Sequence, residues 1–393
     1  MTIAKKIKSS ISQSSMIRKM FDEGILLKKK YGADKVYDFS LGNPNVEQPE
    51  EFKRELINLA SEIIHLKHGY TPNAGYSETR KAIAQKINKT SGLKMDLDHI
   101  IMSCGAGGAL NVILKALLDP GDEVMVLKPF FVEYPFYIEN YGGIVKYAET
   151  KKDFSLDIDS ISEAISDKTK AIIINSPNNP TGIVYNEKEI GELSRVLLEK
   201  GRATGKTIYL ISDEPYAEIV FDGVTVPSIF KAYPNSILAY SYSKTLSLPG
   251  ERIGYIAVNP QIYEAGDLIS ALILCTRIMG FVHAPALMQR IVARLQDVAV
   301  NVKIYQNKRD LLCTGMAKAG YKFTKPQGAF YLFVQSPIPD DVAFVQMLLK
   351  KNILVVPGSG FGGPGYFRIA YCVDDATIVN SLDGFAQAIK ECK

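Results

Sequence analysis

Two basic residues eight positions apart are the first candidates for chemistry. Lys244 closes the segment Ser241-Tyr242-Ser243-Lys244, which follows the apolar run Ile237–Tyr240, and Arg252 leads into the run Ile253–Val258. A lysine amine that is partly removed from water can be neutral and nucleophilic, so it can attack a carbonyl carbon. A neighbouring arginine suits an anion. Taken alone, the same side chains could simply extend their charged ends from strand ends into water.

A glycine-rich turn offers a second candidate, a site for a phosphate. Cys104-Gly105-Ala106-Gly107-Gly108 follows the apolar run Ile100–Ser103 and leads into a predicted helix. Small residues let backbone N–H groups approach an anion, and a helix N-terminus adds partial positive charge. The dinucleotide fingerprint G-x-G-x-x-G is not met because Leu110 stands at its third glycine, and no Gly-Lys-Ser/Thr of a P-loop follows. Because glycine turns into helices are common, this segment alone leaves its role open.

Three further polar segments follow or interrupt apolar runs. Asp213-Glu214-Pro215-Tyr216 comes directly after Ile208–Ser212, and a second segment, Asn175-Ser176-Pro177-Asn178-Asn179-Pro180-Thr181-Gly182, ends another run. Their structural alternatives are a helix N-cap and a turn stiffened by proline. Arg368 interrupts the apolar run Phe367–Cys372, which is costly unless its guanidinium finds an anion.

The elements around these residues predict an α/β fold. Short, β-branched, mostly uncharged runs indicate buried strands at Ile100–Ser103, Glu123–Leu127, Ile144–Ala148, Ala171–Asn175, Ile208–Ser212, Ile237–Tyr240 and Ile253–Val258. Helices fit between them at Gly108–Leu118, Phe131–Tyr141, Ile158–Ile165 and Glu187–Lys200. This alternation predicts a three-layer αβα large domain with a mostly parallel seven-stranded sheet. Ligands bind at the carboxyl edge of such a sheet, where the candidate residues would meet.

The chain ends predict a second, smaller α+β domain. Helical patterns dominate residues 261–318, and further strands are expected at Gly328–Val334, Leu354–Val356 and Phe367–Cys372. The remaining helices are expected at Ser15–Lys30, Glu50–Lys67, Asp340–Lys350 and Asp374–Glu391. A length of 393 residues fits two domains. We predict a large domain over residues 49–285 and a small domain built from residues 1–48 and 286–393.

Composition argues against several classes of protein. The net charge is +4, from 46 basic and 42 acidic residues, which is too small to indicate nucleic-acid binding. Only His65 and His68 of the four histidines lie close in sequence, so we predict no metal site. Five cysteines without a C-x-x-C pair, and no apolar run of membrane-spanning length, favour a cytoplasmic protein that does not enter membranes.

The five polar segments together point to one cofactor. Pyridoxal phosphate needs a lysine for its Schiff base, a cradle for its phosphate, and an acid opposite its pyridinium nitrogen. The sequence offers Lys244, the turn at Gly105–Gly107 and Asp213 for these tasks. Each feature is weak alone, but all lie where strands are expected to end, and together they favour this cofactor.

The sequence resembles the fold-type I, pyridoxal-phosphate-dependent aminotransferases of class I/II, the aspartate-aminotransferase-like group. The resemblance runs from Asp38-Phe39-Ser40-Leu41-Gly42-Asn43-Pro44 to Arg368, and its most specific motifs are Asn179-Pro180-Thr181-Gly182 and Ser241-x-Ser243-Lys244-x₇-Arg252. It implies a ping-pong reaction that moves an amino group between an L-amino acid and a 2-oxo acid. It also implies a homodimer with shared active sites.

The resemblance assigns a role to each matching residue. Catalysis would rest on Lys244 as Schiff-base lysine and proton shuttle, on Asp213 as partner of the pyridinium nitrogen, and on Tyr216. Tyr216 and Asn179 would donate hydrogen bonds to the cofactor's 3′-oxygen, and Arg368 would bind the substrate α-carboxylate beside Gly42. The other cofactor contacts would come from Gly105, Ala106, Gly107, Ser241 and Arg252, with Tyr70 reaching over from the second subunit.

The chain also departs from that family. Phe131 stands where relatives often stack a tryptophan on the pyridine ring, and the chain has no tryptophan. Gly107 stands where some relatives carry a lysine that helps to hold acidic side chains, which argues against aspartate as the substrate. Arg277 does not align cleanly with a distal-carboxylate arginine, so we expect it on the surface. The glycine-rich run 357–365 is expected to be a mobile loop of the pocket.

Two alternative functions stay open on sequence alone. A C–S β-lyase of the same fold would use the same cofactor and the same carbanion chemistry. A cofactor-sensing transcriptional regulator would need a DNA-binding domain, yet only about 40 residues precede Gly42 and they show no helix-turn-helix pattern. No motif identifies the amino donor.

Overall fold

The computed structural model describes residues 2–12 and 16–392. Seven strands form one sheet in the order β2-β8-β7-β6-β5-β3-β4. All neighbours are parallel except β8, which is antiparallel to both β2 and β7. The prediction of an α/β fold with a mostly parallel seven-stranded sheet is confirmed. The strands are β2 Ile100–Ser103, β3 Glu123–Lys128, β4 Ile144–Glu149, β5 Thr169–Asn175, β6 Tyr209–Asp213, β7 Ser236–Ser241 and β8 Gly254–Val258.

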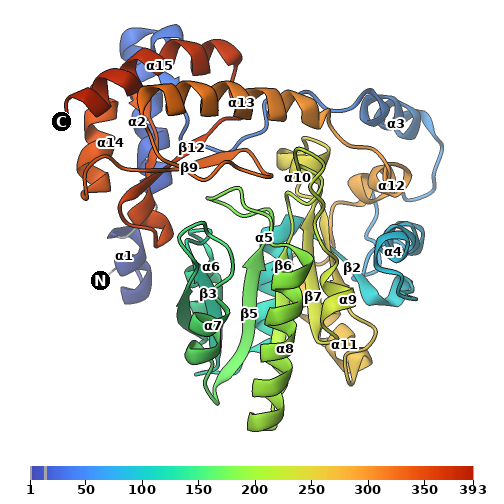
Figure 1. Cartoon of the computed structure of the whole chain (residues 1–393). Coiled ribbons are helices and arrows are strands. Elements are labelled where there is room, and N and C mark those ends of the chain that lie inside the picture. The colour runs from blue at the N-terminus through green and yellow to red at the C-terminus, as the bar shows by residue number, and fades with distance from the viewer. Residues whose placement is uncertain (1, 13–15, 393) are drawn as a thin grey trace.

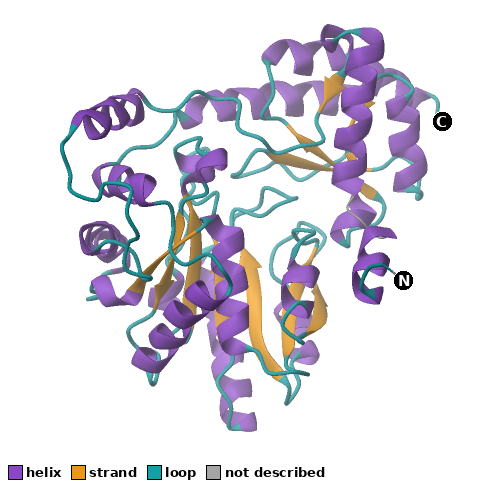
Figure 2. Ribbon diagram, turned by 180° about the vertical axis from the view of Figure 1, so that it is seen from behind, coloured by secondary structure: helices purple, strands orange, loops and turns teal. Residues whose placement is uncertain are grey.

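Both faces of this sheet are buried except at the edge strand β4, which explains the apolar runs of the other strands. In β5, Ile172 and Ile174 belong to one hydrophobic cluster, whereas Ala171 and Ile173 belong to another on the opposite face. Helices cover the sheet on both sides (Figures 1 and 2). The helices packed around the sheet are α3 Glu50–Ser61, α4 Ser77–Ser91, α5 Gly105–Leu117, α6 Tyr134–Glu139, α7 Ile158–Ala164, α8 Glu187–Thr204, α9 Ile229–Ala232, α10 Tyr242–Thr245, α11 Ala265–Ile278 and α12 Ala286–Arg294.

A third cluster of buried residues lies around a smaller antiparallel sheet, shown above the large one in Figure 1. Its strands are β11 Val356–Pro357, β12 Tyr366–Ala370 and β9 Tyr331–Gln335, in that order. Beside it, β1 Tyr37–Asp38 pairs in parallel with β10 Ile353–Leu354, so segments from both ends of the chain meet here. The helices of these two ends are α1 Lys5–Ser12, α2 Met16–Tyr31, α13 Val302–Ala319, α14 Asp341–Leu349 and α15 Asp375–Lys390.

The domain bounds stay a prediction. The third cluster draws residues from both chain ends, as a small domain of residues 1–48 and 286–393 would. However, α12 falls in the predicted small domain, while its Met288, Ile291 and Val292 belong to the cluster that also holds Leu59 of α3 and Ile83 of α4.

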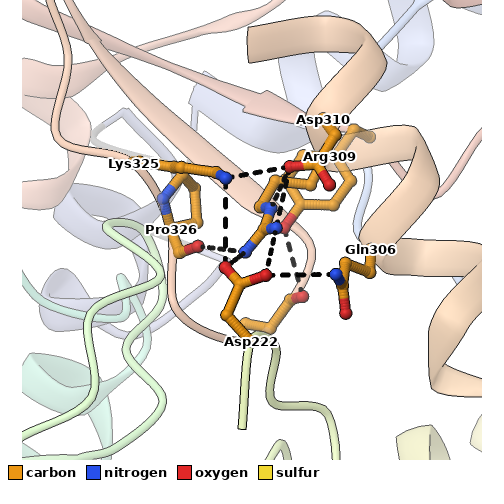
Figure 3. A network of polar contacts seen from close by, with 8 residues as sticks. Asp222, Gln306, Arg309, Asp310, Lys325 and Pro326 are labelled. Carbon is orange, nitrogen blue, oxygen red and sulfur yellow. Dashed lines mark hydrogen bonds and ion pairs between the residues drawn. The ribbon is translucent and has the colours of Figure 1, made fainter. Parts of the chain in front are cut away.

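A buried arginine joins the segment after β6 to helix α13 and to the loop at Pro326 (Figure 3). Arg309 of α13 is 0% exposed and donates to both carboxylate oxygens of Asp222, at 2.8 and 3.2 Å. It also donates to Asp310 at 2.7 Å and to the carbonyl of Pro326 at 3.1 Å. A paired and fully hydrogen-bonded guanidinium tolerates burial. The network therefore fixes the turn at Asp222, a few residues beyond Tyr216.

Several predicted boundaries were wrong, for local reasons. The helix expected over Glu50–Lys67 ends at Ser61, because Lys67 folds back and donates to the carbonyls of Leu59 and Ala60 at 2.7 and 2.9 Å. The strand expected from Gly328 begins at Tyr331, because Gly328 and Ala329 instead bond to the segment at Val220 and Ile219.

The helix expected from Gly108 begins at Gly105, so part of the glycine turn lies inside the first helical turn. The helix expected over Phe131–Tyr141 covers only Tyr134–Glu139. The helix predicted over Ser15–Lys30 is Met16–Tyr31 in the structure, and Ser15 itself is outside the described residues.

Candidate active site

A cavity of about 380 Å³ lies at the carboxyl edge of the large sheet. Strands β5, β6 and β7 end at this edge, and the antiparallel β8 begins there, which places Arg252 beside the others. Convergence at this edge is the expected place for a ligand in such folds. The predicted residues that line the cavity are Gly42, Ala106, Gly107, Phe131, Asn179, Asp213, Tyr216, Ser241, Lys244, Arg252 and Arg368.

Lys244 lies on the short helix α10, directly after β7. Ser241 caps this helix by accepting a hydrogen bond from the backbone N–H of Ser243 at 3.2 Å. The Lys244 ammonium donates to the carbonyl of Gly42 at 2.9 Å and lies 5.3 Å from the centroid of the Phe330 ring. Burial lowers the pKa of Lys244 to about 8. At pH 7 about a tenth of the amine is therefore neutral, and so nucleophilic, far more than for an exposed lysine.

Asp213 supplies an unsatisfied carboxylate to the same cavity. It is 5% exposed, and its Oδ2 accepts a hydrogen bond from the Tyr134 hydroxyl at 2.6 Å. Its Oδ1 is buried without a hydrogen-bond partner among the described residues. Burial raises the pKa of Asp213 to about 7. A buried acceptor left open in this way suits a cationic N–H donor on a ligand.

Arg368 provides an anion site in the same cavity. Its Nη1 donates to Asn179 Oδ1 at 3.0 Å and its Nη2 to the carbonyl of Ser40 at 2.6 Å. It is 2% exposed, and in the described part of the chain its Nε has no partner. No ion pair to a carboxylate is found for it within residues 2–12 and 16–392, and burial lowers its pKa. Such a guanidinium suits the carboxylate of a ligand.

A second anion site lies where α5 begins. Ala106 and Gly107 are in the first turn of this 13-residue helix, whose free N–H groups favour a negative charge. Arg252 donates to the carbonyls of Cys104 and Pro249 at 3.2 and 3.0 Å. Gly105 does not line the cavity; its φ is +73°, and an added Cβ would lie 2.7 Å from Arg252 Nη2. Its role is therefore to leave room for Arg252.

Like Gly105, Tyr70 and Arg277 do not line the cavity. Tyr70 is 88% exposed and packs edge-on against His283, with ring centroids 5.7 Å apart. Its contact with a second subunit stays a prediction. Arg277 is exposed on α11, as expected.

The structure adds residues in or beside the cavity to which the sequence alone assigned no individual role. Tyr331 lines the cavity, and its hydroxyl lies 2.8 Å from that of Tyr216. The Tyr134 hydroxyl donates a hydrogen bond to the Asp213 carboxylate, and Asn175 Nδ2 donates one to the backbone carbonyl of Asp213 at 2.7 Å. Tyr134 and Tyr331 resemble ordinary core aromatics in sequence, so no signal separates them from packing residues. The glycine-rich run 357–365 places the buried Phe361 against Arg368.

The described residues contain no group of three or more histidine, cysteine, aspartate or glutamate side chains arranged to hold a metal ion. None of the helices described is both long enough and apolar enough to cross a membrane.

The two buried ionisable groups predict opposite pH dependences for the free energy of unfolding of the unliganded chain. Between pH 8 and 10.5 the unfolded chain still holds the Lys244 proton that the folded chain has released, so stability should rise with pH. Between pH 3.8 and 7 the folded chain holds the Asp213 proton that the unfolded chain has released, so stability should fall as pH rises.

Near pH 7.5 the folded chain bears the free-energy cost of burying a charged Lys244 and that of keeping Asp213 buried. Lys244→Met and Asp213→Asn should therefore each stabilise the unliganded chain, by about 1–3 kcal/mol. Urea unfolding of each variant against wild type measures this difference. A loss of stability in both variants at pH 7.5 would contradict the assigned burial costs.

Comparison with known proteins places this geometry in a family. The family model "Aminotransferase class I and II" matches residues 34–385. An aspartate/prephenate aminotransferase of Thermus thermophilus is 32% identical over 367 residues, which cover 92% of each chain. A probable aspartate/prephenate aminotransferase of Aquifex aeolicus is 32% identical over 370 residues, covering 91% of each chain.

Solved structures agree with the sequence comparison. An amino transferase from Eubacterium rectale superimposes with a TM-score of 0.96 at 38% identity, covering 100% of this chain and 99% of that one. The aspartate aminotransferase of Thermus thermophilus with maleate gives a TM-score of 0.86 at 28% identity, covering 99% and 100%. These relatives are named aminotransferases, so the β-lyase alternative is not favoured. The chain belongs to the class I and II aminotransferases.

Proposed function

We propose that the chain moves an amino group between an L-amino acid and a 2-oxo acid with pyridoxal phosphate as its cofactor. The observation that carries this proposal is the juxtaposition, in one cavity, of the Lys244 amine and the unpartnered Oδ1 of Asp213. When bound, pyridoxal phosphate supplies a carbonyl carbon and a conjugated ring that withdraws electrons from the substrate α-carbon.

The residues around the cavity fit this group. The Asp213 Oδ1 atom would accept the pyridinium N–H, and the first turn of α5, with Ser241 and Arg252, would hold the phosphate. Phe131, also in the lining, would contact the ring. Asn179 and Tyr216 would donate to the ring oxygen. Tyr70 of a second subunit would complete the phosphate site.

The chain's own residues would perform the proton transfers. The Lys244 amine, kept partly neutral by burial, would take the proton from the substrate α-carbon and donate it to the carbon that the cofactor's carbonyl supplies. The Asp213 carboxylate would keep the pyridinium nitrogen protonated. Arg368 would orient the substrate by binding its carboxylate. Burial of Arg368 and Asp213 strengthens both interactions because water is excluded.

The side chain of the amino donor is not fixed by these contacts. The relatives named above include aspartate aminotransferases. In this chain the lysine and arginine side chains that line the cavity are Lys244, Arg252 and Arg368, and each already has a proposed role. A second substrate carboxylate would need a cation from the second subunit. Because Gly107 stands where some relatives carry a lysine that helps to hold acidic side chains, we propose donors with uncharged side chains.

The proposal includes a cytoplasmic homodimer. Ile63, Leu66 and Tyr70 expose large apolar side chains on one short segment, which suits contact with a second subunit. The five cysteines are free, as expected in a reducing compartment. Analytical ultracentrifugation of the purified chain would test the dimer, and sedimentation as a monomer would reject it.

Replacing Arg368 by alanine tests the substrate site. The variant should raise KM for both amino acid and 2-oxo acid by about 100-fold, because a buried guanidinium–carboxylate contact is lost. Pyridoxal phosphate content should be unchanged. Arg277→Ala is the matched control, since that arginine is exposed and outside the cavity. Equal KM values in the Arg368 variant and the control would reject the assigned carboxylate site.

A further inference from the structure

Tyr331 contacts both Arg368 and Tyr216 in the cavity. It is the first residue of β9, is 3% exposed, and lines the cavity between Arg368 and Tyr216. Its ring contacts the Arg368 guanidinium, and its hydroxyl contacts the Tyr216 hydroxyl. The ring and the hydroxyl can therefore be considered, and tested, separately.

The ring forms one half of an aromatic clamp on Arg368. The guanidinium carbon lies 4.7 Å from the centroid of the Tyr331 ring and 4.7 Å from that of the Phe361 ring. A planar guanidinium stacks well on aromatic faces because it is weakly hydrated. With its Nη1 and Nη2 bound to Asn179 and Ser40, the plane of the guanidinium is fixed before any carboxylate arrives. Such preorganisation strengthens binding by reducing the ordering cost.

The Tyr331 hydroxyl affects how Tyr216 can donate a hydrogen bond to a ligand. The two hydroxyl oxygens are 2.8 Å apart, and each phenol has only one proton to donate. If Tyr216 gives its proton to a ligand oxygen, Tyr331 must be the donor within the pair. A hydroxyl that accepts one hydrogen bond becomes a better donor of the next, because successive hydrogen bonds polarise one another.

The shape of the neighbouring backbone keeps the Tyr331 hydroxyl in place. A Cβ added at Gly42 would overlap this hydroxyl, so glycine leaves the space that the hydroxyl occupies. The carbonyl of the same Gly42 accepts the hydrogen bond from Lys244. The Tyr331 hydroxyl is therefore held at the junction of the substrate and cofactor ends of the site.

We propose that Tyr331 is a positioning residue with two separable tasks. Its ring fixes the plane of Arg368 for the substrate carboxylate, and its hydroxyl donates to Tyr216 so that Tyr216 donates more strongly to the cofactor's ring oxygen. The second task rests on the function proposed above, whereas the contacts themselves do not.

The test compares Tyr331→Phe with Phe361→Leu in protein loaded with pyridoxal phosphate. Tyr331→Phe keeps the ring and removes the hydroxyl, so the pH midpoint of the visible absorbance of the bound cofactor should rise by about 0.5 unit, with KM nearly unchanged. Phe361→Leu removes one face of the clamp, so KM should rise by about 5-fold with the midpoint unchanged. A merely structural role would not separate these two readouts.

Two results would overturn the proposal. One is an unshifted midpoint in Tyr331→Phe, and the other is an equal change of both readouts in both variants. A cofactor-free measurement keeps this outcome distinct from a failure of the proposed function. In thermal unfolding of the unliganded chain, Tyr216→Phe and Tyr331→Phe should lower Tm by less in combination than the sum of the single shifts. Additive shifts would show that the hydroxyl pair is not coupled.

Discussion

Replacing Lys244 by alanine should lower kcat by about 10⁴-fold or more, because the substitution removes both the nucleophile and the proton-transfer group. In the wild-type protein loaded with pyridoxal phosphate, borohydride treatment should leave the added mass on the peptide that carries Lys244. In the variant no such peptide should appear. Steady-state kinetics and mass mapping measure the two effects independently.

Lys308 provides a matched control for this substitution. It is also a buried lysine, but its ammonium binds the carbonyl of Val373 at 2.6 Å and Asp375 at 2.8 Å, outside the cavity. Lys308→Ala should reduce stability and leave kcat of the folded protein near the wild-type value. Cofactor fixed by borohydride in Lys244→Ala, or turnover similar to wild type, would contradict the assignment of Lys244.

Replacing Asp213 by asparagine should lower kcat by about 10³-fold while the variant still binds pyridoxal phosphate. The substitution keeps the size of the side chain and its hydrogen-bond acceptor for Tyr134, but removes the negative charge that the cavity aims at its ligand. Stopped-flow measurement of the first half-reaction isolates this effect from product release.

Substitutions at two neighbouring residues show whether the loss of rate is specific to the charge of Asp213. Glu214 is the next acid in the chain, and it lines a different cavity and accepts from Ser212 at 2.7 Å. Glu214→Gln should therefore leave the half-reaction rate unchanged. Tyr134→Phe removes only the support of the Asp213 carboxylate and should cost about 10-fold. Equal rates in Asp213→Asn and wild type would exclude a charge role for Asp213.

The sequence predicted the large sheet well because most of its strands are buried on both faces. Such strands consist of short apolar runs, and the parallel strands end in a polar residue where the chain reaches the carboxyl edge, as at Asp213 and Ser241. Helix ends were harder to predict. Lys67 ends α3 through two contacts that no local pattern encodes.

The charged members of the site could also be predicted, and the family resemblance indicated Phe131 and Tyr216, whereas Tyr134 and Tyr331 could not be predicted. A buried arginine such as Arg368 is costly enough to require an explanation, so it is conspicuous in a strand. A buried tyrosine is ordinary. Tyr134 and Tyr331 became functional candidates only when the fold placed their hydroxyls 2.6 and 2.8 Å from Asp213 and Tyr216.

The most direct test of transamination is a product balance in the first half-reaction. Purified protein loaded with pyridoxal phosphate is mixed with single amino acids, without any added 2-oxo acid, and the 2-oxo acid and ammonia are quantified. We expect the preferred donor, with an uncharged side chain, to yield one equivalent of 2-oxo acid per subunit and no ammonia, and addition of a 2-oxo acid to start continuous turnover. Continuous release of ammonia without an acceptor would contradict transamination and indicate β-elimination.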